Sequence, residues 1–203
     1  MEDIFSVKNK VIIITGAGKG IGSMLADELL KRSAIVYAID KTFPKYDKKK
    51  NYFRKKCDIT NKIQVEKICK DIFKNEKKID VLINNAGITI PNNSLNEYSL
   101  ENWKKTLDVN LTGSFLCSQI IGKILKKQHS GSIINMTSIN AELGFPNNPA
   151  YVASKGGLKM LTKSLAKDLG KYGIRVNNLG PGYFVTDMTK NSYKNKKSRI
   201  SRQ

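Results

Sequence analysis

Tyr151 and Lys155 have the residue types and the spacing that proton transfer requires. In a helix, side chains four residues apart share one face, so the phenol and the ammonium would be neighbours. A phenol with an ordinary pKa of about 10 is a poor acid or base at neutral pH. An adjacent positive charge favours the phenolate and lowers that pKa. The pair is therefore a candidate acid–base device.

This spacing is common in so lysine-rich a chain, and taken alone it distinguishes nothing. Five of the eight tyrosines are followed by a lysine four residues later, namely Tyr37, Tyr46, Tyr52, Tyr151 and Tyr193. For any one of them, the simpler interpretation is two side chains that share a solvated face. Only the surrounding elements can single out one pair.

A glycine-rich turn between a strand and a helix is predicted near the start of the chain. Residues 10–15 form an apolar run suited to a buried parallel strand, and helical periodicity follows Gly22. A simple turn needs one or two glycines, whereas this pattern lets the backbone approach a pyrophosphate at a helix N-terminus. The sequence therefore predicts a dinucleotide site. Its residues are Thr15, Gly16, Lys19, Gly20, Ile21 and Gly22.

The type of dinucleotide depends on two residues of opposite charge. Asp40 follows the second predicted strand, where a carboxylate accepts hydrogen bonds from ribose hydroxyls and repels a 2′-phosphate. Lys19, inside the glycine turn, could attract that phosphate. Because the Asp40 charge would lie against the phosphate itself, we expect NAD to be preferred, with NADP possible. A solvated turn residue is the alternative interpretation of Asp40.

Strands and helices alternate along the rest of the chain. Strands are predicted at 34–39, 52–57, 81–83, 132–136 and 174–179, and helices at 63–73, 100–128 and 151–169. This alternation predicts one α/β domain over residues 1–203, with a doubly wound, Rossmann-like parallel sheet covered by helices on both faces. The carboxyl ends of such strands form the ligand crevice, and Asn85 and Ser138 follow two of them. Asn110 lies in mid-helix, where a helix-bending or satisfied core amide is the simplest interpretation.

Composition argues against several classes of protein. A hydrophobic content of 40% and a charged content of 26% are ordinary for a globular domain, and no apolar run is long enough to cross a bilayer. Three scattered cysteines and one histidine argue against a metal site and fit a reducing, cytoplasmic setting. The net charge is +19, but the 36 basic residues include only five arginines and are spread along the chain. We therefore expect no specific nucleic-acid partner.

Together these segments resemble the short-chain dehydrogenase/reductase family. The resemblance spans nearly the whole chain in the family's order, and the ordered set is specific although each motif alone is weak. Of the five tyrosine–lysine pairs, only Tyr151 and Lys155 follow a strand-end serine, Ser138, at the family's spacing. The matching residues are Thr15-Gly16-x-x-x-Gly20-x-Gly22, Asp58-Ile59, Asn84-Asn85-Ala86-Gly87, Asn110, Ser138, Tyr151-x-x-x-Lys155 and Pro181-Gly182-x-x-x-Thr186.

The resemblance implies an oxidoreductase that transfers a hydride between a nicotinamide cofactor and a secondary alcohol or ketone. It implies that Tyr151 is the acid–base group and that Lys155 lowers its pKa and binds the nicotinamide ribose. Ser138 would hold the substrate oxygen. Asn110 would hold a water that links Lys155 to solvent, which replaces the simpler interpretation of that amide.

Further cofactor contacts are implied by the same resemblance. Asp58 and Ile59 would lie at the adenine, and Asn85 would line the cofactor. Thr186 would lie near the nicotinamide carboxamide. No metal ligand is implied.

The resemblance indicates the substrate and the oligomeric state less specifically. Residues 3–7, 142–144 and 181–189 are similar to segments of gluconate 5-dehydrogenase and related sugar-acid dehydrogenases, but the last is also common in 3-oxoacyl-[acyl-carrier-protein] reductases. A small-molecule substrate and a homodimer or homotetramer are expected. Family members usually continue through a helix pair and a seventh strand, so this domain is expected to be truncated before that strand. A non-catalytic subunit is the alternative that this truncation raises.

Overall fold

A computed structural model describes residues 5–44, 49–92, 94–186 and 188–189. Within these ranges, six strands pair in one parallel sheet in the order β3-β2-β1-β4-β5-β6. The order reverses between β1 and β4, and open α/β sheets bind ligands at such a point. The strands are β1 (Val11–Thr15), β2 (Ile35–Asp40), β3 (Tyr52–Lys56), β4 (Val81–Asn84), β5 (Gly131–Met136) and β6 (Ile174–Leu179).

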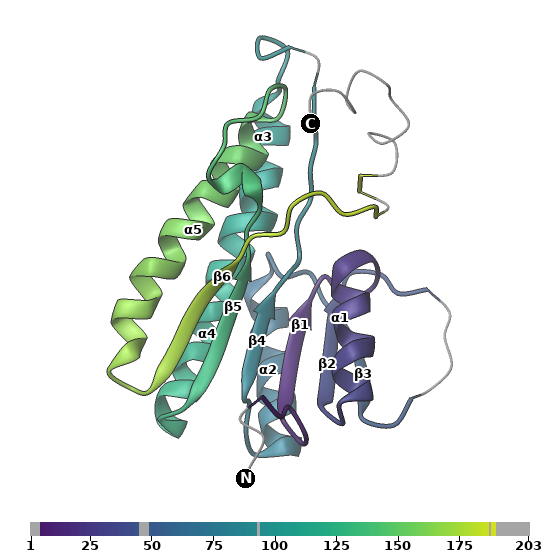
Figure 1. Cartoon of the computed structure of the whole chain (residues 1–203), viewed down its shortest axis with the longest axis vertical. Coiled ribbons are helices and arrows are strands. Elements are labelled where there is room, and N and C mark those ends of the chain that lie inside the picture. The colour runs from purple at the N-terminus through teal and green to yellow at the C-terminus, as the bar shows by residue number, and fades with distance from the viewer. Residues whose placement is uncertain (1–4, 45–48, 93, 187, 190–203) are drawn as a thin grey trace.

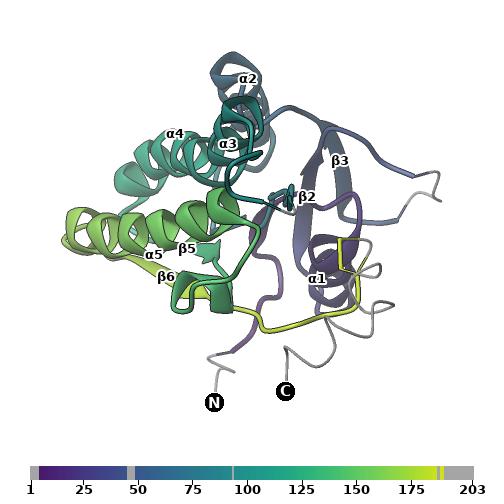
Figure 2. The same cartoon turned by 90° about the horizontal axis from the view of Figure 1, so that it is seen from above.

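Helices cover both faces of this sheet, as the sequence predicts. On one face lie α2, α4 and α5, and on the other α1 covers β1 and β2 (Figures 1 and 2). The prediction of a doubly wound parallel sheet is confirmed. The helices are α1 (Gly20–Lys31), α2 (Lys62–Glu76), α3 (Leu100–Leu107), α4 (Gly113–Gln128) and α5 (Pro149–Gly170).

The apolar run of β1 is buried because both of its faces are covered. Ile13 packs in the cluster shared with α2 and α4, whereas Ile12 and Ile14 pack in the cluster shared with α1. Successive side chains of a strand point to opposite faces, so a strand covered on both sides needs apolar residues at every position. This is why the pattern is continuous rather than alternating.

The helix predicted over residues 100–128 is interrupted. Between α3 and α4 lies a π-helical turn, η1 (Asp108–Thr112), with Asn110 at its centre. A π turn holds one extra residue and is frequent at functional sites. Asn110 is fully buried in this turn.

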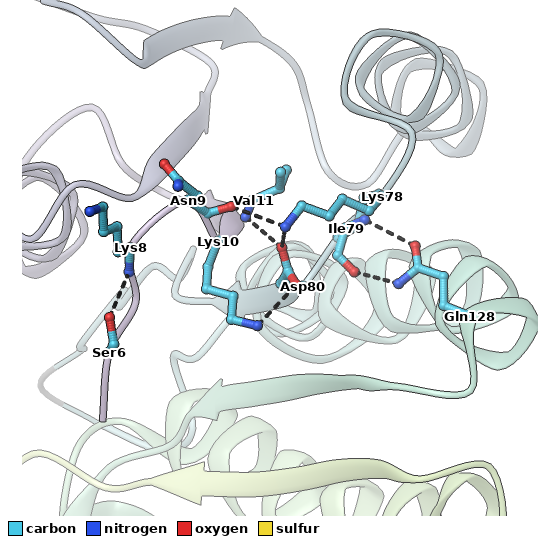
Figure 3. Close-up of polar contacts among 9 residues, drawn as sticks. All are labelled: Ser6, Lys8, Asn9, Lys10, Val11, Lys78, Ile79, Asp80 and Gln128. Carbon is cyan, nitrogen blue, oxygen red and sulfur yellow. Dashed lines mark hydrogen bonds and ion pairs between the residues drawn. The ribbon is translucent and has the colours of Figure 1, made fainter. Parts of the chain in front are cut away.

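Asp80 links the amino ends of β1 and β4 (Figure 3). This end of the sheet lies opposite the carboxyl ends of the strands. Its carboxylate accepts a hydrogen bond from Val11 N at 2.8 Å and forms ion pairs with Lys78 and Lys10 at 3.0 and 3.5 Å. The Gln128 amide bonds both Ile79 N and Ile79 O, at 3.0 and 2.8 Å. These contacts hold in alignment the two strands that carry the glycine turn and Asn85.

Candidate active site

A cavity of about 400 Å³ opens where the six strands end. Its walls come from the turns that follow the strands, together with the first turns of α1 and α5. Three predicted residues do not line it. Gly22 and Asn110 pack against its lining residues Gly16 and Gly87, and the Thr15 hydroxyl accepts a hydrogen bond from Asn85 N at 3.0 Å. The predicted residues that line it are Gly16, Lys19, Gly20, Ile21, Asp40, Asp58, Ile59, Asn85, Ser138, Tyr151, Lys155 and Thr186.

The start of α1 presents an uncapped helix N-terminus to the cavity. Lys19 is the N-cap of α1, and its side chain makes no capping hydrogen bond to the first turn. Gly20 and Ile21, the first helical residues, line the cavity. Uncapped N–H groups and the positive end of the helix dipole favour an anion at this position.

Close packing requires glycine at two places in this turn. A Cβ on Gly16, whose φ is +65°, would lie 2.6 Å from Ala86 Cα, and a Cβ on Gly22 would lie 2.3 Å from Gly16 O. The Asn85 amide donates to Thr15 O and Gly16 O, both at 3.0 Å. The loop after β4 therefore packs closely against the glycine turn and holds its backbone in place.

Asp40 lies at the tip of β2 and is fixed against the glycine turn. Its carboxylate accepts hydrogen bonds from Gly18 N at 2.8 Å and from Thr42 N at 3.3 Å. A Cβ on Gly18 would lie 2.9 Å from Asp40 Oδ2. The carboxylate is thus a held group at the edge of the cavity, which argues against a merely solvated turn residue.

Asp58 forms an ion pair that the sequence did not predict. Lys41 Nζ lies 2.8 Å from Asp58 Oδ2, and Thr60 donates to Oδ1 through its backbone N at 3.0 Å and its hydroxyl at 2.8 Å. Partial burial acts to raise the pKa of Asp58, but the hydrogen bonds from Lys41 and Thr60 outweigh it and hold that pKa below its ordinary value. A donor group of a ligand would compete with Lys41 for Oδ2.

Ser138, Tyr151 and Lys155 converge toward the β5 side of the cavity. Ser138 follows β5, and the other two lie one turn apart near the start of α5. Lys155 Nζ lies 5.6 Å from the centre of the Tyr151 ring and donates to Met136 O at 2.7 Å. Burial lowers the pKa of Lys155 to about 8.

The pKa of Tyr151 departs from the sequence-based expectation. Burial raises it above its ordinary value, and a hydrogen bond with Ser138 lowers it only in part. Lys155 does not reverse the balance, because burial disfavours its ammonium form and its Nζ is directed to the Met136 carbonyl. This geometry gives a raised phenol pKa, not the lowered one that was expected.

Asn110 joins three parts of the site. Its Oδ1 accepts from Ile88 N at 2.8 Å, and its Nδ2 donates to Ile88 O and to Ser154 Oγ, both at 3.0 Å. Ser154 in turn donates to the carbonyl of Tyr151 at 2.7 Å. The amide is therefore a satisfied buried group, and its partners connect the loop after β4 to the first turn of α5.

Two residues of the site, Ser154 and Met136, were not predicted from the sequence. Ser154 is fully buried, and a small polar residue next to Lys155 was an available signal. Met136 contributes only its backbone carbonyl. No pattern of side chains identifies a carbonyl in advance, so that contact could be found only in three dimensions.

The cavity offers no reactive thiol. Cys57 lines it, but burial raises the pKa of Cys57 to about 11, so this thiol is protonated at neutral pH. Within the described ranges, no cluster of three or more His, Cys, Asp or Glu side chains could hold a metal ion. No helix in the same ranges is long and apolar enough to cross a membrane.

Comparison with known proteins decides the family. The family model described as short chain dehydrogenase matches residues 10–197. The chain belongs to the short-chain dehydrogenase family. Family members are NAD(P)-dependent oxidoreductases acting on CH–OH groups, and this chain is an enzyme of that class.

The names of the individual relatives describe different activities. The 5-keto-D-gluconate 5-reductase of Escherichia coli is 35% identical over 198 residues, covering 94% of this chain and 78% of the relative. A 3-oxoacyl-[acyl-carrier-protein] reductase of Synechocystis sp. is 36% identical, covering 90% and 77%. The solved structure of ElxO with NADP bound has a TM-score of 0.88 and 30% identity, covering 95% and 82%.

Proposed function

We propose that this short-chain dehydrogenase acts on a secondary alcohol or ketone of a sugar or sugar acid, with NAD as its preferred cofactor. The observation that carries the proposal is the convergence of Ser138, Tyr151 and Lys155 in one cavity with the glycine turn and Asp40. A hydroxyl, a phenol and an ammonium are the groups that an alcohol–carbonyl interconversion uses for proton transfer.

Tyr151 transfers the proton at the reacting oxygen in this proposal. It donates to the carbonyl oxygen in reduction and takes the proton from the alcohol in oxidation, while Ser138 holds the same oxygen by a hydrogen bond. Lys155 supplies positive charge beside the phenol and binds the ribose of the cofactor. A Cβ on Gly87 would lie 3.3 Å from Asn110 Oδ1 and 3.5 Å from Lys155 Nζ, so both groups lie beside Gly87. Their closeness supports the proposal that Asn110 holds a water next to Lys155.

A bound nicotinamide cofactor supplies or accepts the hydride in this reaction. The uncapped start of α1 supports pyrophosphate binding there, and the fixed Asp40 carboxylate supports binding of the adenosine ribose. We assign the adenine to Asp58 and Ile59 and the nicotinamide end to Asn85, Tyr151, Lys155 and Thr186.

The substrate class rests on the relatives and on the segments at 3–7, 142–144 and 181–189. The name of the Escherichia coli relative supports a sugar acid. A 3-oxoacyl thioester is the second candidate, because the Synechocystis reductase has nearly the same identity to this chain.

We also propose that the enzyme is a homodimer or homotetramer and acts in the cytoplasm. Family resemblance supports the first proposal, which sedimentation of the purified protein tests. The free, buried Cys57, Cys69 and Cys117 are consistent with a reducing compartment.

A panel of substrates assayed with both cofactors tests the function. Keto-sugar acids, ketoses and 3-oxoacyl thioesters are each offered with NADH or NADPH, and the corresponding alcohols are offered with NAD⁺ or NADP⁺ in the oxidising direction. We expect the highest kcat/KM for a sugar acid or sugar with NAD(H). Faster reduction of the thioester would establish the second candidate, and no turnover of any member would contradict the proposed reaction.

Replacing Asp40 with asparagine is expected to shift the cofactor preference toward NADPH by roughly tenfold. Asparagine keeps an oxygen for Gly18 N, so the turn stays supported, but it removes the negative charge that repels a 2′-phosphate. The measurement is the ratio of kcat/KM for the two cofactors. Asp168→Asn on the exposed side of α5 is the charge-matched control. An unmodified enzyme that prefers NADPH would show that Lys19 outweighs Asp40.

A further inference from the structure

A row of hydrogen-bonded polar side chains crosses the sheet beneath the active site. Asn84 on β4, Asn135 on β5 and Asn178 on β6 are register neighbours in the parallel ladder. Asn84 Nδ2 donates to Asn135 Oδ1 at 2.8 Å, and Asn135 Nδ2 donates to Thr162 Oγ1 at 2.7 Å. Thr162 Oγ1 lies 2.6 Å from Asn178 Oδ1, so the row passes from the sheet through α5 and back to the sheet.

The row lies in the protein interior, where apolar side chains are more usual. Asn84, Asn135 and Thr162 are exposed by only 1%, 0% and 3%. Burying polar groups is unfavourable unless they are hydrogen-bonded, and valine has nearly the shape of threonine. What the hydroxyl adds is direction, because hydrogen bonds fix the relative position of two elements more narrowly than apolar contact does.

Thr162 connects α5 to β5, the strand that Ser138 follows. It lies two turns after Lys155 on α5, and its partner Asn135 directly precedes Met136, whose carbonyl accepts from Lys155 Nζ at 2.7 Å. Two side-chain bonds therefore join α5 to β5, one at the cavity and one below it. Two such points set both the position of α5 along β5 and its tilt, and a single point would leave the tilt free.

Hydrogen bonds to Asn178 hold α5 against β6 near the same point of the helix. Asn178 Nδ2 lies 3.4 Å from Lys159 O, and the single hydrogen of the Thr162 hydroxyl serves either Asn178 Oδ1 or Leu158 O, the latter at 2.8 Å. Thr162 is thus the residue at which the bonds from β5 and β6 meet.

We propose that Thr162 is a positioning residue of this enzyme, which holds α5 against β5 and β6 in the register that brings Tyr151 to Ser138. This inference rests on the proposed function, because it assigns Thr162 an effect on the proton transfer carried out by Tyr151. Thr162 itself touches neither the substrate nor the cofactor; it acts through the placement of the helix.

Two substitutions at Thr162 separate its hydroxyl from its shape. Thr162→Val keeps the shape and removes the hydroxyl, and we expect kcat to fall by roughly ten- to a hundredfold, since small misplacements of reacting groups have effects of that order. KM for the cofactor should change less than kcat, because the glycine turn and Asp40 lie on other elements. Thr162→Ser keeps the hydroxyl and is expected to restore kcat to near the unmodified value.

Thr106 provides a matched control. It is also a fully buried threonine in a helix, but its Oγ1 has no hydrogen-bond partner in the described part of the chain. Thr106→Val makes the same chemical change without removing such a bond. We expect it to leave kcat unchanged and stability unchanged or slightly higher.

Titration of Tyr151 tests the inference without turnover. The phenol is followed by absorbance as the difference between each protein and its Tyr151→Phe derivative. A loosened Ser138 contact should raise the Tyr151 pKa in Thr162→Val and not in Thr162→Ser. If the unmodified enzyme turned over no substrate, the proposed reaction would fail while this titration still decided the role of Thr162.

The inference is overturned if Thr162→Val keeps the unmodified kcat and Tyr151 titration, or if Thr106→Val lowers kcat as much. If Thr162→Val does not fold, Asn178→Ala on β6 takes its place in both measurements. Asn178→Ala should change kcat and the titration in the same direction but less, and an unchanged result there overturns the inference equally.

Discussion

Replacing Tyr151 with phenylalanine is expected to reduce kcat by roughly 10²- to 10⁴-fold, the range typical of a lost general acid or base. The substitution removes only the hydroxyl, so the ring keeps its place beside Lys155 and the cavity keeps its shape. Cofactor affinity should therefore stay within a few-fold of the unmodified enzyme. The measurements are steady-state kcat and the dissociation constant of NADH by fluorescence.

Tyr172→Phe is the matched control for that substitution. Tyr172 lies against Lys126 and Lys171 and is not among the residues that line the cavity, and its ring centre is 4.4 Å from Lys126 Nζ. It should keep the unmodified rate. A Tyr151→Phe enzyme that retained more than about a tenth of kcat would remove Tyr151 from the proposed acid–base role.

The order of elements was predictable because each strand and helix has a local pattern. The run Ile12 to Ile14 is apolar at every position, as a strand covered on both faces must be, and the structure buries all three residues. The site followed from the same information, since strands of a parallel sheet end at one edge and bring Asp40, Asn85 and Ser138 together there.

What the sequence did not predict depends on contacts between distant residues. In the π turn η1, the Asn110 side chain makes hydrogen bonds to Ile88 and Ser154, which are 22 and 44 residues away in the sequence. The ion pair of Lys41 with Asp58 joins the turns after two strands. Neither has a local pattern, so only the assembled sheet reveals them.

The predicted direction of the Tyr151 pKa shift was wrong for a different reason. The sequence shows which charge is nearby but not how deeply either group is buried. Burial raises the pKa of Tyr151 and lowers that of Lys155, and the hydrogen bond with Ser138 only partly offsets this effect at Tyr151. A pair that looks activated in sequence is therefore held by the protein with both groups closer to neutral.

Replacing Lys155 with methionine is expected to abolish turnover and yet stabilise the fold at neutral pH. The folded-state pKa of Lys155 is about 8, below its ordinary value of 10.5. Below pH 8 the folded protein must bury an ammonium, which costs about 3 kcal/mol relative to an unperturbed lysine. Methionine removes that cost but also the bond to Met136 O, so we expect a net gain of about 1–2 kcal/mol in the free energy of unfolding.

The pH dependence distinguishes this cause from better packing. Between the folded pKa of about 8 and the ordinary 10.5, the unfolded state of the unmodified protein binds more protons than the folded state. Its stability therefore rises with pH across that window relative to Lys155→Met, and the advantage of the variant should be lost before pH 10. Denaturant unfolding of both proteins at pH 7 and near pH 10 measures the difference, with Lys163→Met on the exposed side of α5 as the control. A variant that is less stable at both pH values would mean that the bond to Met136 O outweighs the buried charge. In that case Lys155 would stabilise the fold as well as serve the reaction, and the opposition between stability and activity at this position would not exist.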